Sequence, residues 1–575
     1  MRDPIALLEE IQHLMELRGE NPFKIRAFGK AAHALAGRED LLERAQNGTL
    51  SELPSVGKGI AEVLSVYLLT GQSPLREELL REIPPGLAEF SRVPGLGPKK
   101  AARVVEELGI STLGELEYAC RENRLSHLKG FGLALQQKIL EGLLFMRSNE
   151  GLKKLSDVLP WAQEFLKALQ AAFPQSRVSE TGALRRRLEV LSELDFLVEL
   201  TSVGGSQVTE LEVQQEDVQK RVDRLVQDFL AQTKLQFPVR VFLAPASQFG
   251  YELARTTATP QHWDALLHGA VGFNGAETAE LAWGGLGHLR ESPTEEAFYQ
   301  SLGLRVIPPE ARETGEEVEF ARSGALDHLL PLDGVLGVFH NHTTRSDGAA
   351  TLEQMVVAAL ERGYQYIGIS DHSQSAFYAQ GLKEKDLWEQ KKEILELQKK
   401  YPKIRIFWGI ESDILADGQL DYPDSVLAEF DFVIASVHSR LNMDGEAMTN
   451  RLIQAIRNPY TRFLGHPTGR LLLGRKGYEL NMPAIIQEAA RCGVAIELNA
   501  NPHRLDLDWR WGAEMRKHKT LTSIHPDAHE VAGLDDVQWG VWMARKALFP
   551  RELVVNAQSA SQVEQWLKRN PGPVL

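Results

Sequence analysis

The chain has 575 residues, of which 43% are hydrophobic and 25% charged, and its formal net charge is −14. This length and composition exclude a disordered chain and predict three or four domains. The negative charge argues against a surface that coats nucleic acid throughout, although local basic patches or backbone amides could still bind it.

The sequence contains no apolar run of roughly 18 residues, and its N-terminus lacks the basic and then apolar pattern of a secretion signal. We therefore expect a soluble, cytoplasmic protein with no membrane contact. The two cysteines, Cys120 and Cys492, fit a reducing compartment but cannot form a thiolate metal site by themselves. Any metal site must then use histidines and carboxylates.

Residues 1–150 predict an all-helical region, because apolar residues recur at helical spacing between turns rich in glycine and proline. Two of these turns place Gly-x-Gly before a new helix, and a third, degenerate version follows in LKGFGLALQQ. Such turns expose backbone N–H groups at a helix N-terminus, which can bind phosphate without a basic surface. For either Gly-x-Gly turn alone, an ordinary tight turn is the default interpretation. The four glycines are Gly57, Gly59, Gly95 and Gly97.

Residues 151–315 mix helical patterns with strand-like runs, which predicts an α+β domain. We expect strands at residues 194–200, 238–244 and 302–308. A charged stretch without strand character, residues 316–334, is expected to link this domain to the last third of the chain.

Residues 335–575 alternate seven apolar runs with helical patterns, which predicts a distorted (β/α)7 barrel. In such barrels the catalytic side chains come from the C-terminal ends of the strands, so the residues after each run are the candidates for a site. The runs are residues 335–339, 364–370, 404–410, 430–436, 461–465, 494–500 and 520–524.

Histidines and carboxylates follow six of these seven runs. A lone histidine is more often a hydrogen-bonded core or surface residue, but the joint pattern favours a metal site, because imidazole and carboxylate bind zinc, manganese and iron. Nine ligands exceed what one ion takes, so we expect two or three divalent ions. Asp371 and His525 also follow runs. The nine candidates are His340, His342, Asp347, His372, Glu411, His438, His466, Asp527 and His529.

The segments HNHTTRSDG, SDHS, GIESDIL, ASVHS, HPTGR, ELNANPHRLD and PDAH together resemble the PHP (polymerase and histidinol phosphatase) domain, in the form attached to bacterial X-family DNA polymerases. The resemblance implies a metal-dependent 3'-to-5' exonuclease, often with abasic-site or 3'-phosphate cleavage and usually with manganese. It also implies three ligand sets: His340, His342, Glu411 and Asp527; Asp347, His372 and His529; and Glu411, His438 and His466.

Two arginines in these segments, Arg470 and Arg504, are candidates for gripping the scissile phosphate, because a guanidinium matches phosphate oxygens in a bidentate way. A surface salt bridge is an equally good interpretation of each.

The N-terminal region resembles the lyase-type and helix-hairpin-helix modules of the same polymerases, which implies contact with the DNA backbone. In lyase-active relatives a lysine on the helix after the first hairpin forms a Schiff base. The matching residue is Val63, which cannot, so we expect no lyase activity by that route.

The segment SETGALRRRLEVLSELDFLVEL resembles the nucleotidyltransferase signature, in which three aspartates bind two magnesium ions. The first two positions read Glu193 and Asp195, and the third reads Arg240. Magnesium needs oxygen ligands in tight octahedral geometry, so we expect no magnesium at this site. Ala183 replaces the signature serine, and the sugar-binding turn reads Thr-Ala-Thr at residues 257–259.

We therefore predict a monomeric DNA-repair protein that acts mainly as a 3'-end processing nuclease on 3' ends, gaps or abasic sites, with polymerisation absent or very weak. A gap-filling polymerase with exonuclease and abasic-site endonuclease activity is the first alternative. A small-molecule phosphatase of the histidinol-phosphate type is the second, although it would have no use for the hairpins. A non-catalytic DNA-binding scaffold would not keep all nine candidate ligands.

Overall fold

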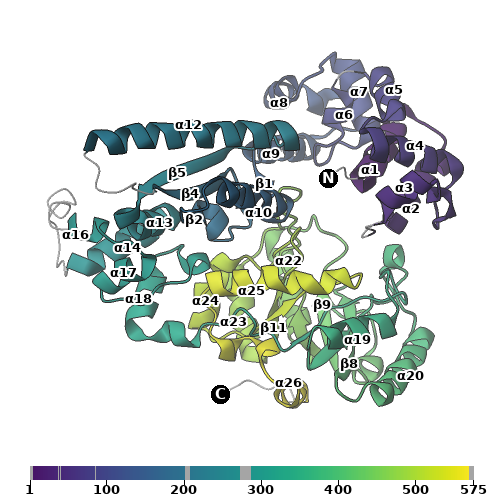
Figure 1. Ribbon diagram of the computed structural model, residues 1–575. Helices are drawn as coiled ribbons and strands as arrows, with labels where there is room; N and C mark the ends of the chain where they lie inside the picture. Colours follow the sequence, from purple (N-terminus) through teal and green to yellow (C-terminus); the bar gives the residue numbers. More distant parts are fainter. Residues whose placement is uncertain are drawn as a thin grey trace. The chain divides into compact units, whose positions relative to one another are not determined.

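The computed structural model describes residues 4–568 except 36, 37, 39, 85, 201–207 and 272–286. The chain forms two compact units, residues 1–150 and 151–575, which Figure 1 shows as ribbons. Among the described residues no helix has the length and apolar character needed to cross a membrane.

The first unit is helical throughout its described part, as predicted. Its core is formed by the apolar faces of these helices, with Leu8, Phe28, Leu64 and Phe90 among the fully or almost fully buried residues. The elements are α1 (Pro4–Arg18), α2 (Pro22–Leu35), α3 (Leu41–Asn47), η1 (Leu50–Glu52), α4 (Lys58–Thr70), α5 (Pro74–Glu82), α6 (Leu87–Phe90), α7 (Pro98–Leu108), α8 (Leu113–Arg121), η2 (Leu125–His127) and α9 (Leu133–Ser148).

The second unit begins with a small α+β part. Its sheet has the order β2-β4-β5, in which β2 and β4 are antiparallel and β4 and β5 are parallel. The long helix α12 (Val208–Thr233) runs along this sheet (Figure 1). The predicted strands at 194–200 and 238–244 are confirmed as β4 and β5. The elements are β1 (Lys153–Lys154), α10 (Leu155–Ala172), β2 (Val178–Thr181), α11 (Gly182–Arg185), β3 (Val190–Leu191), β4 (Leu194–Leu200) and β5 (Val239–Pro245).

A helical part follows, and here the predicted strand at residues 302–308 is wrong. Residues 304–308 belong to no helix or strand, and Leu304 and Ile307 are buried in a cluster with Tyr299 instead. The two prolines that follow lack an N–H group and cannot continue a ladder. The elements are η3 (Ala246–Gln248), α13 (Phe249–Thr257), α14 (Pro260–Val271), α16 (Gly287–Arg290), α17 (Glu295–Ser301) and η4 (Pro309–Ala311).

The stretch expected to be a plain linker, residues 316–334, contains a packed helix. This helix, α18 (Glu316–Ser323), lies against α14, and the short η5 (Ala325–His328) follows it. Glu317 is fully buried, and its Oε1 lies 2.6 Å from Nδ1 of His262. The stretch is free of strands, as predicted, but it is part of the fold.

The rest of the second unit is the predicted barrel of seven parallel strands, arranged in chain order. The first and last strands meet at their C-terminal ends, where Asn341 bridges to Ala528 and the N–H of His342 donates to the Ala528 carbonyl at 2.8 Å. The strands are β6 (Gly337–Val338), β7 (Tyr366–Ile369), β8 (Arg405–Asp413), β9 (Phe432–Ser436), β10 (Thr461–Leu464), β11 (Ala495–Asn499) and β12 (Thr522–His525).

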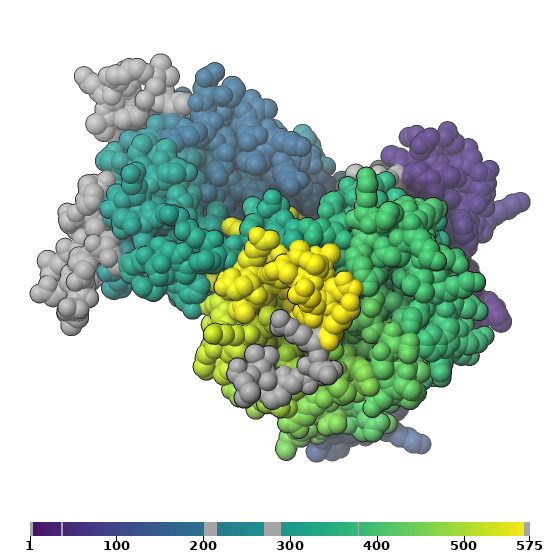
Figure 2. All heavy atoms as spheres, turned by 90° about the horizontal axis from the view of Figure 1, so that it is seen from below, coloured from purple at the N-terminus to yellow at the C-terminus, as the bar shows by residue number. Residues whose placement is uncertain are grey.

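Helices cover the outside of the barrel. Figure 2 shows the yellow C-terminal residues lying against the green barrel residues as one continuous surface. The helical elements are α19 (Leu352–Glu361), η6 (Phe377–Ala379), α20 (Glu384–Lys400), α21 (Asp424–Leu427), α22 (Gly445–Ile456), α23 (Met482–Cys492), η7 (Trp509–Trp511), α24 (Gly512–Lys517), η8 (Ala532–Asp536), α25 (Val537–Lys546), η9 (Arg551–Leu553), η10 (Val555–Ala557) and α26 (Ala560–Leu567).

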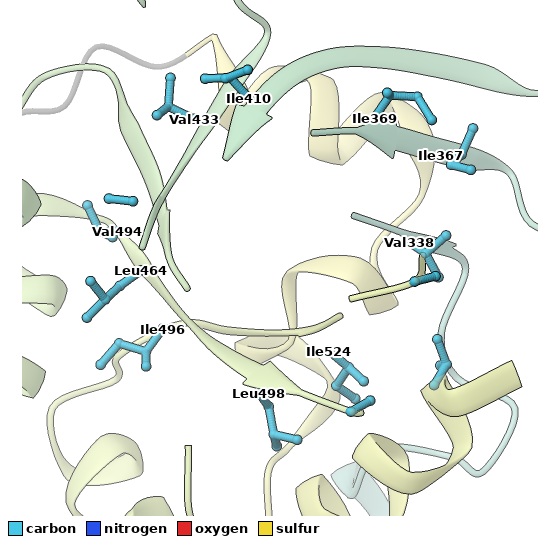
Figure 3. Packing of buried hydrophobic residues seen from close by; sticks show 14 of the residues in the cluster. Val338, Ile367, Ile369, Ile410, Val433, Leu464, Val494, Ile496, Leu498 and Ile524 are labelled. Carbon is cyan, nitrogen blue, oxygen red and sulfur yellow. The ribbon is translucent and has the colours of Figure 1, made fainter. Parts of the chain in front are cut away.

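Successive strand residues face opposite sides of the barrel wall, which separates two apolar layers. The outer layer packs against the helices, and Figure 3 shows it around the ring from Val338 on β6 to Ile524 on β12. The inner layer is an aromatic plug in which the ring of Phe339 lies 4.9 Å from Phe432 and 5.0 Å from Phe463. His525 contacts this plug, with its ring 4.8 Å from that of Phe463.

The barrel and the α+β part are joined by buried ion pairs. Lys546, which is almost fully buried on α25, donates to Glu313 at 2.5 Å and to the carbonyl of Arg186 at 2.8 Å. The indole N–H of Trp509 donates to Glu189 at 3.1 Å. These polar groups find their partners across the junction, and the two parts lie in one compact unit.

Candidate metal centre

Glu411 lies at the centre of the barrel mouth, fully surrounded by imidazole rings. Strand β8 runs on past the predicted run as far as Asp413, so Glu411 projects from the strand itself. Its Oε1 lies 3.1 Å from His340 Nε2, 3.2 Å from His438 Nε2 and 3.1 Å from His466 Nε2. Its Oε2 lies 2.9 Å from His372 Nδ1 and 3.7 Å from His342 Nε2. One carboxylate thus faces five histidines.

Two aspartates complete the set on the side nearer to solvent. Asp527 Oδ1 lies 3.5 Å from His340 Nε2, 3.3 Å from His342 Nε2 and 3.8 Å from His529 Nδ1. Asp347 Oδ2 lies 3.5 Å from Nε2 of both His372 and His529. All nine predicted ligand residues therefore lie together in one continuous cluster.

The cluster runs from a closed interior to an open rim. The side chains of His340 and Glu411 are fully buried, whereas those of Asp347 and His529 are 25% and 40% exposed. Among the described ligand residues, the cluster is thus most open to solvent on the Asp347 and His529 side.

The donor atoms fall into groups small enough for single ions, but the groups differ from the three sets implied by the resemblance. His342 stands with the set that includes Asp347, and His466 stands with His340 and Asp527. The groups, within each of which the donor atoms lie within 4.8 Å of one another, are His342, Asp347, His372 and His529; His340, His466 and Asp527; His340, His342 and Glu411; His372, Glu411 and His438; and His340, His525 and Glu497.

The donor set fits divalent metal ions. Within the described residues, several buried polar atoms of the cluster have no hydrogen-bond partner: His340 Nε2, both ring nitrogens of His342, Glu411 Oε2 and His466 Nδ1. Unpartnered buried groups of this kind are costly, and imidazole and carboxylate are the donors that Zn, Mn and Fe take. A metal ion would satisfy them.

The pKa values of the cluster reflect its mutual charges. Burial lowers the pKa of His372, but Glu411 and Asp347 outweigh it and raise that pKa to about 10. Burial, together with the neighbouring His529 and His372, lowers the pKa of His342 to about 3. Burial opposes ionisation of Glu411, yet His438 and His340 hold its pKa well below the ordinary value. The carboxylates are therefore ionised, as metal ligands must be.

Three residues of the cluster have an unusual backbone conformation. His340, His466 and Asp527 have φ values of 58°, 21° and 53°, in the left-handed region that residues other than glycine rarely adopt. Such conformations persist only where the surrounding structure enforces them, and they gather at functional sites.

Sequence reasoning missed a carboxylate behind the cluster, Glu497 on β11, the one run that no candidate ligand follows. It is fully buried and accepts hydrogen bonds from His340 Nδ1, from the backbone N–H of His466 and, at 2.9 Å, from His525 Nδ1. Asp413 plays a similar part for His438, with its Oδ1 2.5 Å from Nδ1. A glutamate inside the apolar run VAIELNA was the available signal.

The two candidate phosphate-binding arginines differ in their contacts. Arg470 donates to Asp508 and to the backbone carbonyls of Arg504 and Leu505, so its guanidinium is engaged within the protein. Arg504 Nε lies 3.6 Å from Asp527 Oδ2, and its side chain is 24% exposed. Arg504 is thus at the rim of the cluster, whereas Arg470 supports the loop beneath it.

The residues that match the nucleotidyltransferase signature form an ion pair. Asp195 on β4 and Arg240 on β5 are directly opposite in the ladder. Arg240 donates to Asp195 Oδ1 at 2.9 Å and Oδ2 at 3.1 Å, and its NH2 lies 2.7 Å from Glu193 Oε1. A guanidinium therefore lies between the two carboxylates. The Thr257 side chain is also engaged, because Arg185 donates to its hydroxyl at 3.0 Å.

Three hairpins of the first unit share one backbone geometry. In each, a residue with positive φ is followed by a buried apolar residue and then by a glycine that caps the next helix. The third hairpin, noted above as a degenerate version, has the same form as the other two. Gly59 does not belong to such a triplet, because it is the second residue of α4. The triplets are Ser55, Val56 and Gly57; Gly95, Leu96 and Gly97; and Gly130, Phe131 and Gly132.

These hairpins leave room for a close approach to the backbone. A Cβ atom added at Gly57, Gly97 or Gly132 would meet no atom within 4 Å. The first N–H groups of α4, α7 and α9 have no intrahelical acceptor and are available to a phosphate.

Known families match both units. A helix-hairpin-helix domain matches residues 2–73, a SAM-like helix-hairpin-helix tandem matches residues 87–143, and the PHP domain matches residues 339–477. The "DNA polymerase/3'-5' exonuclease PolX" of Bacillus subtilis (strain 168) is 36% identical over 581 residues, 99% of each chain.

Other similar proteins cover the barrel alone. A probable phosphatase of Caldicellulosiruptor saccharolyticus is 34% identical over 239 residues, which are 38% of this chain and 90% of that protein. The crystal structure of histidinol phosphate phosphatase from Lactococcus lactis covers 37% of this chain and 94% of its own, with 19% identity and a TM-score of 0.30. The full-length relative has both units. The chain therefore belongs to the PolX family, the bacterial X-family DNA polymerases that carry a C-terminal PHP domain.

Proposed function

We propose that the chain hydrolyses phosphodiester bonds at the 3' ends of DNA in its PHP barrel and that its nucleotidyltransferase-like part does not polymerise. The observation that carries the proposal is the position of Glu411, buried among five imidazoles with an open rim on one side. Paired with the hairpins of the first unit, this centre suits a DNA substrate better than a small phosphate ester.

The nine predicted ligands would hold two or three ions of manganese, zinc or iron. Divalent ions in such a site polarise phosphoryl oxygens and activate water for attack on phosphorus. The protein's part is to hold the ligands: Glu497 and Asp413 accept hydrogen bonds from His340 and His438, which fixes the ring nitrogens that face Glu411. Arg504 at the rim is the better placed of the two arginines to contact the scissile phosphate.

The remaining parts would hold DNA in place. We assign residues 1–150 to DNA-backbone binding, 151–315 to a degenerate polymerase domain, 316–334 to a connecting segment and 335–575 to the nuclease. The substrates would be 3' ends, gaps or abasic sites, bound by a monomer.

Loss of polymerisation is supported by the contacts of Arg240. Two magnesium ions would need carboxylate oxygens that the guanidinium already occupies, and its positive charge repels a divalent ion. A protein of this kind that has a carboxylate in place of Arg240 would lack this barrier. An active gap-filling polymerase is therefore the alternative to be tested.

The test is a paired assay on a 5'-labelled primer annealed across a short gap. The intact protein and His340→Ala are each incubated with manganese, with and without deoxynucleotides. We expect the intact protein to shorten the primer, the variant to leave it intact, and neither to extend it. Lys517→Ala, an exposed substitution on α24, is the matched control and should behave as the intact protein does.

Extension of the primer by His340→Ala would overturn the polymerase part of the proposal. Shortening at the wild-type rate by His340→Ala would overturn the assignment of hydrolysis to the barrel.

A further inference from the structure

A lysine of the α+β part reaches the rim of the metal centre. Lys154, the second residue of β1, lies with its Nζ 2.6 Å from Nδ1 of His503, on the loop that follows β11. The next residue of that loop is Arg504, whose Nε lies 3.6 Å from Oδ2 of the candidate ligand Asp527. Consecutive Cα atoms are about 3.8 Å apart, so the lysine–histidine pair is one residue away from a side chain that contacts the cluster.

Further hydrogen bonds support this contact on both sides. The N–H of Leu155 donates to the carbonyl of Glu189 at 3.0 Å, and the carboxylate of Glu189 accepts from Arg510 of the barrel at 2.7 Å. On the barrel side, the N–H of Leu472 donates to the carbonyl of His503 at 2.7 Å. The end of β1 and the loop after β11 are therefore tied to the same part of the barrel.

The pair offers hydrogen-bond donors to the solvent. An ammonium group can only donate, so Nδ1 of His503 accepts from Lys154 and the ring proton is on Nε2. Burial, together with Lys154, lowers the pKa of His503, so the ring is neutral at pH 7. His503 is exposed, and no partner of its Nε2 is found among the described residues. An N–H group and an ammonium group are thus available side by side.

The charges around the pair favour an anion. Lys154 also lies 3.6 Å from Asp157, an acid whose side chain is 46% exposed. Arg504 supplies a second cation next to His503, so two cations stand against one exposed acid. A phosphate oxygen accepts strong hydrogen bonds from charged donors, which makes a phosphate the anion that fits this position on a DNA-binding protein.

The structure of a DNA 3' end decides which phosphate this can be. The last linkage contains the scissile phosphate, and the terminal nucleoside beyond it has no further phosphate. Every other phosphate lies on the 5' side, in the strand that remains after the cut. We infer that Lys154 and His503 bind the phosphate of the penultimate linkage while the last linkage lies at the metal cluster. This subsite rests on the proposed nuclease function and adds a preference for substrates with a charged phosphate one linkage before the cut.

The first test removes the charge of that phosphate and the charge of the lysine, separately and together. Single-stranded oligonucleotides carry either a phosphate or an uncharged methylphosphonate at the penultimate linkage. For the intact protein, kcat/KM should be about tenfold lower with the methylphosphonate, the scale of one lost charge-assisted hydrogen bond. Lys154→Ala should cut both oligonucleotides with similar kcat/KM, and Lys154→Arg should keep most of the preference.

The matched control is Lys153→Ala. It removes the same charge from the other residue of β1, whose side chain points to the opposite face of the strand, and it should keep the tenfold preference. His503→Ala should lose the preference as Lys154→Ala does. The double variant should lose little more than either single variant, because both side chains contact the same phosphate.

A binding measurement does not depend on hydrolysis. A phosphorothioate at the last linkage slows cutting of the oligonucleotide while its affinity is measured at several salt concentrations. The slope of log affinity against log salt should be smaller in magnitude by about 0.7 in Lys154→Ala, since one contact with a phosphate of single-stranded DNA is lost. Lys153→Ala should keep the slope of the intact protein.

Two results would overturn the subsite: equal kcat/KM for the two oligonucleotides with the intact protein, or an undiminished preference in Lys154→Ala. The second result holds even if Lys154→Ala cuts both oligonucleotides more slowly, because a purely structural lysine would lower both rates alike. If the intact protein cuts neither oligonucleotide but the salt slope falls as expected in Lys154→Ala, the phosphate subsite stands and the proposed nuclease function fails.

Discussion

Glu497 holds the histidines in the deepest part of the barrel. Its carboxylate is taken up by these contacts and is not open to a substrate. Its two oxygens accept hydrogen bonds from His340, His525 and the backbone of His466. Burial raises the pKa of Glu497, but His340 and His525 outweigh burial and hold that pKa well below the ordinary value. Carboxylates in this position fix the tautomer of a ligating histidine and make it a better donor.

Replacement of Glu497 by glutamine should therefore lower metal affinity by roughly 10- to 100-fold, the usual effect of losing such a partner. The measurement is metal content after dialysis at a fixed free metal concentration. Glu514→Gln, on the surface of α24, is the matched control. Equal metal content in Glu497→Gln and the control would show that the contact has no part in metal binding.

Arg240 raises a second question at the scale of single residues: whether one substitution could restore a polymerase. We expect Arg240→Asp, made together with His340→Ala, to give no primer extension with magnesium or manganese. Ala183 supplies no hydroxyl, and the Thr257 side chain is held by Arg185, so other parts of the site remain changed. Extension by the double variant would show that Arg240 alone blocks the activity.

At this scale the sequence predicted that the nine candidate residues would lie close together, because each follows a recognisable strand-like run; their role as ligands stays a prediction. It could not predict which donors face one another. Both carboxylate oxygens of Glu411 face imidazole rings because β8 continues through this residue. His466 groups with Asp527 through a backbone with positive φ. Neither property leaves a trace in residue spacing.

Among the elements, the hairpins carry the proposed binding of DNA through backbone groups. The prediction concerns Gly97→Val, which places a side chain where nothing lies within 4 Å and the φ of −66° is accessible to any residue. Stability should change little, while affinity for duplex DNA should fall about tenfold because the phosphate can no longer approach the helix N-terminus. Fluorescence anisotropy and thermal melting measure the two effects.

The control for this variant is Gly114→Val, at another glycine with open space around it, on α8. If both variants bind DNA equally well, the hairpin at Gly97 is an ordinary turn.

A second element-scale prediction concerns the ion pairs among α11, α17 and η4. Burial raises the pKa of Glu295, but Arg312 and Arg185 outweigh it and lower that pKa to about 2. Because the pKa is lower in the folded than in the unfolded chain, the stabilisation is complete above the ordinary value of 4.5 and is lost as the pH falls toward 2.

Glu295→Gln should thus destabilise the second unit by about 3 kcal/mol at neutral pH, since it leaves buried arginines unpaired, and should lose less further stability between pH 4.5 and 2. Thermal melting across this pH range is the measurement. Glu296→Gln changes the exposed neighbour and serves as control. Parallel pH profiles for the two variants would contradict the role of Glu295.

The elements that sequence patterns failed to predict lie in this same region. The run LGLRVIP has strand-like composition, yet its apolar residues fill a helical core beside Tyr299, and its prolines prevent pairing. The acidic stretch after it reads as a solvent-exposed link, but Glu317 is buried against His262. In both places a distant partner decides the structure, which local pattern cannot reveal.

Across the whole molecule, metal binding should stabilise one compact unit and leave the other unchanged. Removal of metal with EDTA is expected to lower the melting temperature of the second unit, because unpartnered buried donors remain in the barrel, and manganese should restore it. An ion present at 1,000 times its Kd contributes about 4 kcal/mol. Differential scanning calorimetry measures the transitions, and the first unit is the internal control. A shift of both transitions, or of neither, would contradict the expectation.

The barrel and its seven strands follow from the sequence because periodicity and strand-end chemistry repeat over more than 200 residues. The contacts between the barrel and the α+β part could not be predicted from the sequence. Lys546, Glu313 and Arg186 are far apart in the chain, and each alone looks like a surface charge.

The seam between β6 and β12 has a consequence for how the enzyme is made. The bridge from Asn341 to Ala528 directly follows His340 on one side and Asp527 on the other, so the cluster gains its last members only when nearly the whole chain has left the ribosome. The first unit can fold long before that, because domains fold in order of synthesis. A nascent chain could therefore bind DNA while it is still unable to cut it. Nuclease activity would begin only when synthesis of the chain is nearly complete.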